Sequence, residues 1–193
     1  MSPEPKNNPP RPGAAEVAFI GMGSNLGDRR KMFRRALEMI GRLPQTKVVA
    51  LSPLYYTDPA DGIGGGEFLN GIARLATKLA PLELWRSLQE IEISLARKDK
   101  GKNRPRTIDL DLLLHGRRVL NSPALVIPHP RMTERAFILR PFLDLAPDAV
   151  VPPLNLTVAQ LWRRLPDQSG VQPATDIEIT EILPHVPTGE GQR

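Results

Sequence analysis

The stretch that decides the fold is Asn103-Arg104-Pro105-Arg106-Thr107-Ile108-Asp109-Leu110-Asp111-Leu112-Leu113-Leu114. Successive side chains of a β-strand point to opposite faces, so alternation reveals which face is buried. One set of alternate positions is apolar and predicts a core face: Ile108, Leu110, Leu112 and Leu114. The other set predicts the opposite face: Thr107, Asp109, Asp111, Leu113 and His115. Aspartate is depleted in strands, so two on one face, about 6.5–7 Å apart at Cα, need a chemical reason.

The aspartate pair fits a divalent cation. Two carboxylates this close repel each other, and a cation between them removes the repulsion. Mg²⁺ prefers carboxylate oxygens, and substrate phosphates often complete its coordination. Arg104 and Arg106 lie just before the pair and suit phosphate oxygens, which arginine binds in a planar fork. A solvated strand face with salt bridges is the alternative interpretation, because short motifs often match by accident.

Composition sets broad limits on what the protein can be. At 193 residues, with 40% hydrophobic and 24% charged residues, the chain suits one globular domain. The net charge of +5 fits an anionic substrate, and it fits nucleic acid as well. The absence of cysteine excludes disulfides and thiolate metal sites. We find no secretory signal and no apolar run of about 20 residues, so we expect a cytoplasmic protein without a membrane partner.

The order of predicted elements indicates the fold class. Proline-rich residues 1–15 predict a disordered leader, 16–165 one domain, and 166–193 a partly disordered C-terminal extension. Hydrophobic periodicity predicts these elements: strand 17–21, turn 21–27, helix 28–43, strand 46–57 broken at Pro53, strand 68–78, helix 81–95, the aspartate strand, an extended segment 126–130, helices 133–145 and 157–164, and a strand at 177–183. This order predicts an α+β, ferredoxin-like split βαβ sandwich, mostly antiparallel, with helices on one face and a C-terminal helical extension. The other face would carry Asn70 beside the two aspartates.

Several other motifs have a plain structural interpretation. Gly21, Gly23 and Gly27 do not have the spacing of a dinucleotide-binding fingerprint, and no P-loop is present, so a tight turn is favoured. His129 stands between two prolines and could donate a hydrogen bond to a phosphate oxygen or could simply be a surface residue. Phe68 and Phe137 could stack on a flat heterocycle or belong to the core.

Taken together, the chain resembles the 6-hydroxymethyl-7,8-dihydropterin pyrophosphokinase family over residues 17–165. Five segments carry the resemblance in the family's order: Gly21-Met22-Gly23-Ser24-Asn25-Leu26-Gly27-Asp28; Tyr56-Thr57-Asp58-Pro59; Phe68-Leu69-Asn70; Pro105-Arg106-Thr107-Ile108-Asp109-Leu110-Asp111; and Ile127-Pro128-His129-Pro130 with Arg135 and Phe137. The resemblance implies an ATP-dependent diphosphotransferase of tetrahydrofolate biosynthesis. It would transfer diphosphate from ATP to the hydroxymethyl group of the reduced pterin and release AMP.

The resemblance also implies roles for individual residues. Asp109 and Asp111 would hold two Mg²⁺ ions and act in catalysis with Arg97 and Arg106. The implied ATP contacts are Gln89, Glu92, Arg106, Leu112, His129 and Arg135. The implied pterin contacts are Thr57, Asp58, Phe68, Asn70 and Phe137. ATP and the pterin are the expected partners, and other folate-pathway enzymes are candidates.

Two departures and two rival functions accompany this resemblance. Asn103-Arg104 stands where the family often has Trp-Gly, and Phe68 stands where tyrosine is common. The first departure favours, as one rival, a catalytically weakened homologue that binds pterin or nucleotide. The second rival is an RNA-binding module on the same fold. Such modules stack bases on aromatic residues, whereas aspartates on a strand repel phosphate in the absence of metal.

Overall fold

The computed structural model describes residues 14–58, 66–95 and 107–183. The predicted catalytic residues Arg97 and Arg106, most of the proline-rich leader and the last ten residues lie outside these ranges. The division into leader, domain and extension therefore stays a prediction. No helix in the described ranges is long and apolar enough to cross a membrane.

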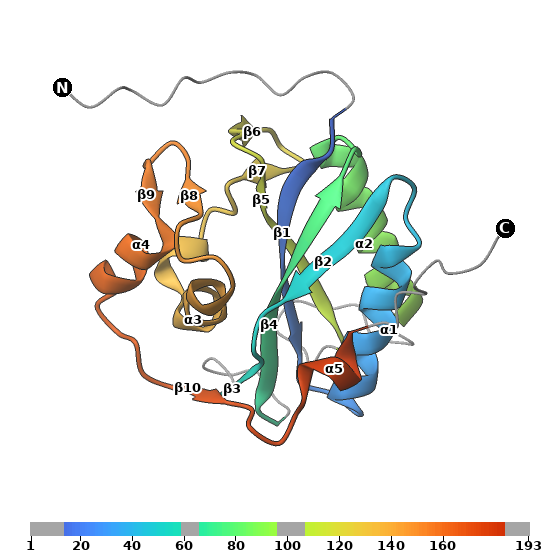
Figure 1. Ribbon diagram of the computed structural model, residues 1–193, viewed down its shortest axis with the longest axis vertical. Helices are drawn as coiled ribbons and strands as arrows, with labels where there is room; N and C mark the ends of the chain where they lie inside the picture. The colour runs from blue at the N-terminus through green and yellow to red at the C-terminus, as the bar shows by residue number, and fades with distance from the viewer. Residues whose placement is uncertain (1–13, 59–65, 96–106, 184–193) are drawn as a thin grey trace, which may run out of the picture.

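An antiparallel sheet forms the centre of the molecule (Figure 1). Its strands are β1 (Glu16–Ser24), β2 (Thr46–Leu51), β3 (Tyr55–Thr57), β4 (Phe68–Thr77), β5 (Asp109–His115) and β10 (Val171–Pro173). The spatial order is β10-β3-β4-β1-β5, and β2 also pairs with β4. With β2 and β3 taken as one broken strand, this is the order of a split βαβ sheet, and the predicted fold class is confirmed. The aspartate strand β5 lies at one end of that order.

Two helices cover one face of the sheet (Figure 1). They are α1 (Arg29–Gly41) and α2 (Pro81–Leu95). The side chain of Asp28 caps α1, near the start of the predicted helix, by accepting a hydrogen bond from the Lys31 amide at 3.0 Å. Ile108, Leu110 and Leu112 are buried on this face, as their alternation predicts. Leu114 was predicted on the same face but is buried with Phe19 on the opposite one, because the register of β1 and β5 (Asp109–His115) shifts between Phe19 and Ile20.

The opposite face is divided into a covered half and an open half. The helices α3 (Ala136–Leu145) and α4 (Val158–Arg164) lie over the covered half, where Phe142 packs against Phe19, with ring centroids 4.6 Å apart. Leu113 is buried there too. Two short elements complete this layer, the 3₁₀ turn η1 (Met132–Glu134) and the hairpin of β8 (Val150–Val151) and β9 (Leu156–Thr157). The hairpin of β6 (Leu120–Asn121) and β7 (Val126–Ile127) instead packs through Leu120 and Ile127 against the core on the α1 and α2 side. The predicted helical extension thus occupies part of the face that carries the aspartates.

Two predicted element boundaries and one predicted element type were wrong. Strand β1 continues to Ser24, so Gly21 and Gly23 lie in the sheet rather than in a turn. The helix predicted at 133–145 begins later, because residues 132–134 form the η1 turn and α3 begins after Arg135. Residues 177–183 form no strand but contain the short helix α5 (Ile179–Ile182), whose Ile179 and Ile182 have the spacing of one helical face.

The C-terminal segment packs onto the rest of the molecule. Strand β10 pairs with β3, and Ala174, Ile177 and Ile182 join the core under α1 and α2. Asp176 accepts hydrogen bonds from Arg30 at 2.5 Å and from the Tyr56 hydroxyl at 3.1 Å. The segment after residue 165 is therefore tied to α1 and to β3 through both apolar and charged contacts.

Candidate functional site

The open half of the sheet carries the two aspartates. The strand register places Asp109 opposite Gly23 and Asp111 opposite Gly21. Gly23 in turn lies opposite Asn70 of β4. A β-carbon on Gly23 would lie 3.3 Å from Asn70 Oδ1 and 4.0 Å from Phe68 Cδ1. The two glycines therefore leave space between the acidic strand β5 and the polar end of β4.

The predicted pterin-binding residues gather on β3, β4 and α3. Asn70 Nδ2 donates a hydrogen bond to Thr57 Oγ1 at 2.8 Å, and both side chains are buried. Phe68 begins β4 two residues before Asn70, on the same face. Phe137 lies in the first turn of α3, where the Arg135 guanidinium stacks on its ring at 5.3 Å. Asp58 follows β3 directly and is exposed.

Glu92 reaches the outer edge of β5 from α2. The Leu110 amide donates a hydrogen bond to Glu92 Oε1 at 2.5 Å. Burial, together with the charges of Asp109 and Asp111 and a hydrogen bond with Asp109, raises the pKa of Glu92 to about 8. The hydrogen bond from Leu110 acts in the opposite direction. The acidic strand therefore has a carboxyl group beside it that holds its proton at neutral pH.

A cationic segment lies along the same edge of β5. The His129 amide donates a hydrogen bond to the Leu113 carbonyl at 3.0 Å, which holds the segment against the strand. Burial lowers the pKa of His129, and the charges of Arg135 and Arg131 lower it further, against the opposing charge of Asp109. The Nδ1 atom of His129 has no hydrogen-bond partner within the described ranges. The imidazole is thus neutral at pH 7 and close to the acidic strand.

Arg135 faces both aspartates. Burial lowers the pKa of Arg135, as does the neighbouring charge of Arg131, whereas Asp111 and Asp109 raise it. Positive side chains on one segment and carboxylates on the adjacent strand give a site with charges of both signs. A polyanion bridged to the carboxylates by a cation would be neutralised from both sides.

The glycine-serine segment is joined to the start of the aspartate strand. Ser24 Oγ, fully buried, donates a hydrogen bond to the Thr107 carbonyl at 2.6 Å. Thr107 Oγ1 in turn reaches the Leu95 carbonyl at the end of α2 at 3.5 Å. Two of the five segments that carry the resemblance therefore meet in space, although 83 positions separate Ser24 from Thr107.

The remaining predicted residues differ in how the structure places them. Gln89 is exposed on α2. The Leu112 side chain is 2% exposed and lies in the core, so a ligand could meet only its backbone, on the outer edge of β5. His115 is buried at the other end of β5, with Nε2 3.0 Å from the Leu79 carbonyl and Nδ1 3.3 Å from Glu16 Oε2. The structure therefore assigns His115 to the interior packing rather than to the site.

Sequence reasoning missed several residues of this region. Gly21 and Gly23 were assigned to a turn, although their alternation with Ile20 and Met22 is the signal of a continuing strand. Arg131 was not considered, yet it acts electrostatically on both His129 and Arg135.

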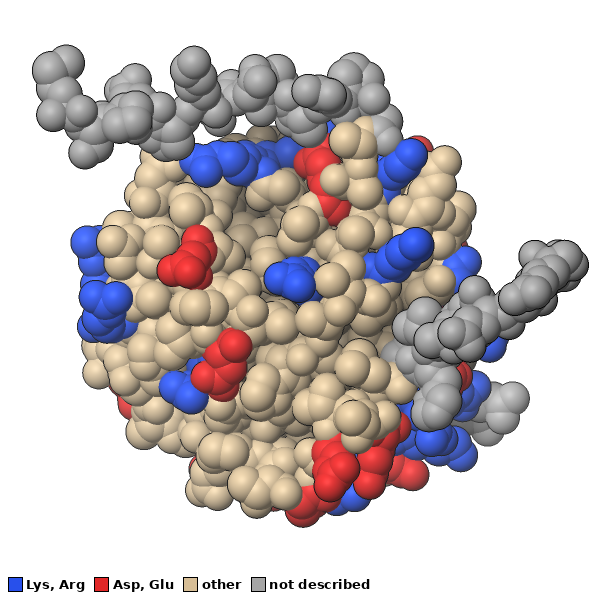
Figure 2. Space-filling view, viewed as in Figure 1, with Lys and Arg blue, Asp and Glu red and all other residues tan. Residues whose placement is uncertain are grey.

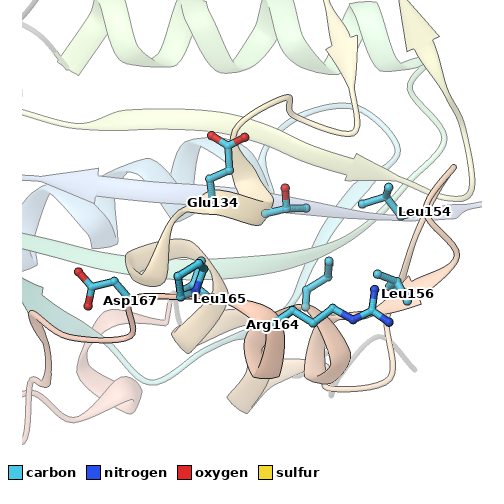
Figure 3. A pocket seen from close by; sticks show the side chains of 9 residues that line it. Glu134, Leu154, Leu156, Arg164, Leu165 and Asp167 are labelled. Atoms are coloured by element: carbon cyan, nitrogen blue, oxygen red, sulfur yellow. The ribbon is translucent and has the colours of Figure 1, made fainter.

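One further hollow, of about 560 Å³, lies on the covered side of the molecule (Figure 3). Figure 3 shows Leu154, Leu156, Leu165 and Arg164 around it, with Glu134 and Asp167 at its rim. None of the predicted site residues lines it. It is therefore separate from the arrangement on the open half of the sheet.

Charge and metal chemistry can be assessed over the described residues. Within those ranges, no group of three or more His, Cys, Asp or Glu side chains is arranged to hold a metal. On the face drawn in Figure 2, basic and acidic side chains are interspersed. The positive net charge does not gather there into the continuous basic surface that nucleic-acid binding favours.

Comparison with known proteins decides the family. Residues 19–147 match the sequence model of 7,8-dihydro-6-hydroxymethylpterin-pyrophosphokinase (HPPK). The chain belongs to the HPPK family. It is 46% identical over 134 residues to a 2-amino-4-hydroxy-6-hydroxymethyldihydropteridine pyrophosphokinase of Pseudomonas aeruginosa, covering 69% of this chain and 83% of that protein.

Larger proteins also contain a region similar to this HPPK chain. The folic acid synthesis protein fol1 of Schizosaccharomyces pombe is 37% identical over 168 residues, which are 87% of this chain and 23% of fol1. A crystal structure of Plasmodium falciparum HPPK-DHPS with pteroate superposes with a TM-score of 0.62 at 14% identity, over 78% of this chain and 44% of that one. At that identity the superposition shows the fold alone. The family, the fold and pyrophosphokinase activity predicted from the sequence are confirmed.

Proposed function

We propose that this chain transfers the diphosphate group of ATP to the hydroxymethyl group of 6-hydroxymethyl-7,8-dihydropterin and releases AMP. Membership of the HPPK family supports the reaction. The arrangement of Asp109 and Asp111 across the glycines from the Asn70–Thr57 pair supports the two-substrate site. The nucleotide would lie along β5 and the pterin between β4 and α3.

The reaction asks mainly for alignment and charge neutralisation. The pterin hydroxyl oxygen attacks the β-phosphorus of ATP, the bond to the oxygen bridging the α- and β-phosphorus breaks, and AMP departs. The hydroxyl proton is released to water as the new oxygen–phosphorus bond forms. Such transfers need little covalent chemistry from the protein, because the catalytic gain comes from positioning and electrostatic stabilisation.

Asp109 and Asp111 are the residues that would hold Mg²⁺, two ions by resemblance to the family. The donors fit this ion because they are carboxylate oxygens, and their charges add to the effect of burial that raises the pKa of the neighbouring Glu92. When bound, Mg²⁺ neutralises phosphate charge and polarises the transferring group. With few protein donors arranged around a metal in the described ranges, triphosphate oxygens and water would complete the coordination.

The other residues take positioning roles in this proposal. His129 and Arg135 would contact the phosphates from the edge of β5, with Glu92 and Gln89 on the nucleotide side of α2. Arg97 and Arg106 would meet the charge that develops on the β-phosphate and on departing AMP. Their assignment rests on the sequence resemblance, since both lie outside the described ranges.

The pterin contacts come from two sides. Thr57 and Asn70 would hydrogen-bond the polar edge of the ring, with Asp58 close by, and Phe68 and Phe137 would stack on its faces. Aromatic stacking suits a flat heterocycle, and buried polar groups provide discrimination against analogues that cannot pair with them. The hydrogen bond between Asn70 and Thr57 supports their role in pterin binding, because it already fixes the orientation of the Asn70 amide.

Product analysis tests the proposed function. Protein, Mg²⁺, ATP and hydroxymethyl-dihydropterin are incubated, and the nucleotide products are separated by chromatography. We expect AMP and the pterin diphosphate in equal amounts, and no AMP when either the pterin or Mg²⁺ is left out. Formation of ADP would indicate an ordinary kinase, and absence of any product would favour a protein that only binds these ligands.

A further inference from the structure

A polar network links β3 to α3 and includes no residue assigned to the site. The Tyr55 hydroxyl donates a hydrogen bond to Asp144. Arg140 Nε donates to the Tyr55 hydroxyl at 3.0 Å, and Arg140 Nη2 donates to Asp144 at 2.8 Å. Each of the three side chains thus contacts the other two. The network is partly protected from water, since Tyr55 is 3% exposed.

One end of the network lies beside the polar edge of the proposed pterin site. Tyr55 is the register partner of Asn70, so the two side chains lie on the same face of adjacent strands. Asn70 is hydrogen-bonded to Thr57, which follows Tyr55 by two residues on that face of β3. A shift of Tyr55 would therefore move the strand that carries one pterin contact.

The other end lies on the helix that carries Phe137. Arg140 and Asp144 are three and seven residues beyond Phe137, so the three side chains share one stripe of α3. The Arg140 guanidinium also lies between two rings, 5.7 Å from Tyr55 and 5.8 Å from Trp162. The stripe that bears the proposed stacking residue is thereby fixed to β3 through directional contacts.

Directional contacts are what positioning requires. Apolar packing of α3 through Ile138, Leu139 and Phe142 supplies adhesion to the sheet. The Arg140–Asp144 ion pair is partly exposed, with side chains 35% and 21% exposed, and such pairs add little stability. What the network adds is a defined orientation of the helix stripe relative to the strand.

We propose that Tyr55, Arg140 and Asp144 are positioning residues that set the separation between Phe137 and the Thr57–Asn70 edge, and thereby the affinity for the pterin. This inference rests on the proposed function, because it assumes that the ring binds between those groups. The nucleotide side is held independently, by the hydrogen bond of the His129 amide to β5 and by the buried Met132. Loss of the network should consequently affect one substrate and not the other.

The variant Tyr55→Phe removes one hydroxyl and keeps the ring. We expect the KM for the pterin to rise about tenfold, with the KM for ATP changed less than about twofold and kcat nearly unchanged, because the groups on β5 stay in place. The matched control is Tyr56→Phe. The Tyr56 side chain packs on the α1 side of the sheet, and its hydroxyl donates a hydrogen bond to Asp176. Because this hydroxyl lies outside the network, its loss should leave both KM values at the wild-type level.

Further variants keep the test decisive. Asp144→Asn should raise the pterin KM selectively as well, and the double variant should do no more than the stronger single one, because both act on the same separation. Equal rises in both KM values, or wild-type values in variants whose unfolding midpoint is unchanged, would overturn the positioning role. If the wild type forms no AMP, the proposed function fails, and equilibrium titration of the pterin into the same variants still tests the positioning role.

Discussion

At the scale of single residues, Glu92 has the most unusual environment in the site. Its pKa is raised from 4.5 to about 8, first by burial and then by Asp109 and Asp111. A raised pKa favours the folded protein while the group is protonated, and this stability is lost as pH rises from 4.5 through about 8. Without divalent cations, the unfolding free energy should fall across this window by up to about 1.4 kcal/mol per pH unit relative to Glu92→Gln.

Urea unfolding at a series of pH values measures this difference. Glu92→Gln keeps the shape of the side chain and can still accept the hydrogen bond from the Leu110 amide, but it cannot ionise. Parallel stability curves for the wild type and the variant would show that Glu92 titrates normally and would contradict the crowding of carboxyl groups at β5.

Gly23 tests whether the space between β5 and β4 is used for binding. A β-carbon at this position would lie 3.3 Å from Asn70 Oδ1, on the open face of the sheet. Gly23→Ala should weaken pterin binding about tenfold, while stability changes by less than about 1 kcal/mol, since alanine suits a strand as well as glycine does. Fluorescence titration with the pterin measures the effect, with ATP binding as the internal control. Undiminished pterin affinity would place the ring elsewhere.

At the scale of elements, Gly71 marks the opposite face of β4. A β-carbon there would lie 2.5 Å from Leu54 Cδ2 and 3.4 Å from Phe33 Cε1, both buried. Gly71→Ala should therefore lower the unfolding free energy by about 1–3 kcal/mol through overpacking. Denaturant unfolding compared with Gly23→Ala separates the two faces. A Gly71→Ala protein as stable as the wild type would contradict the tight packing of β4 against α1.

The elements that sequence could predict are those with a strong period or a clear cap. The apolar stripe of Leu84, Leu88 and Ile91 predicted α2, and alternation predicted β5 and its core face as far as Leu112. It was wrong for Leu114, because the irregular register with β1 leaves no signal in the sequence. The predicted α4 is confirmed, and the capping box of Thr157 with Gln160 stabilises its start. Alternation also predicted that Leu113 lies on the free face of the sheet, but α3 covers half of that face and buries Leu113. Long-range packing of this kind leaves no local period in the sequence.

At the scale of the whole molecule, the C-terminal segment contributes to the main core. Ile182 is 2% exposed and lies in the core beneath α1 and α2, whereas Ile93 on α2 is 63% exposed. Ile182→Ala should lower the unfolding free energy by about 2–4 kcal/mol, and the matched control Ile93→Ala by less than about 0.5 kcal/mol. Thermal or urea unfolding measures both. Equal small effects would show that the segment after residue 165 adds little to the fold.

The site was predictable to the extent that its residues lie in sequence signatures. The structure brings four of these residues together at β5: Asp109, Asp111, His129 and Arg135. The aspartates are close enough for the charge of Asp109 to act on the pKa of His129 and for both charges to act on the pKa of Arg135. The network of Tyr55, Arg140 and Asp144 could not be predicted, because it joins positions 89 residues apart through a helix packing that no motif encodes. Only the spacing of Arg140 and Asp144 by four residues hinted at a pair.

The central claim is that Asp109 and Asp111 hold a cation that presents the triphosphate of ATP. The most direct test is titration calorimetry with a non-reactive ATP analogue, in the presence and in the absence of Mg²⁺. Three proteins are compared: the wild type, the double variant that carries both Asp109→Asn and Asp111→Asn, and the control variant Asp148→Asn, which changes an exposed aspartate. We predict that Mg²⁺ strengthens binding about 100-fold in the wild type and the control and has almost no effect in the double variant. A double variant that keeps the full gain from Mg²⁺ would contradict the account.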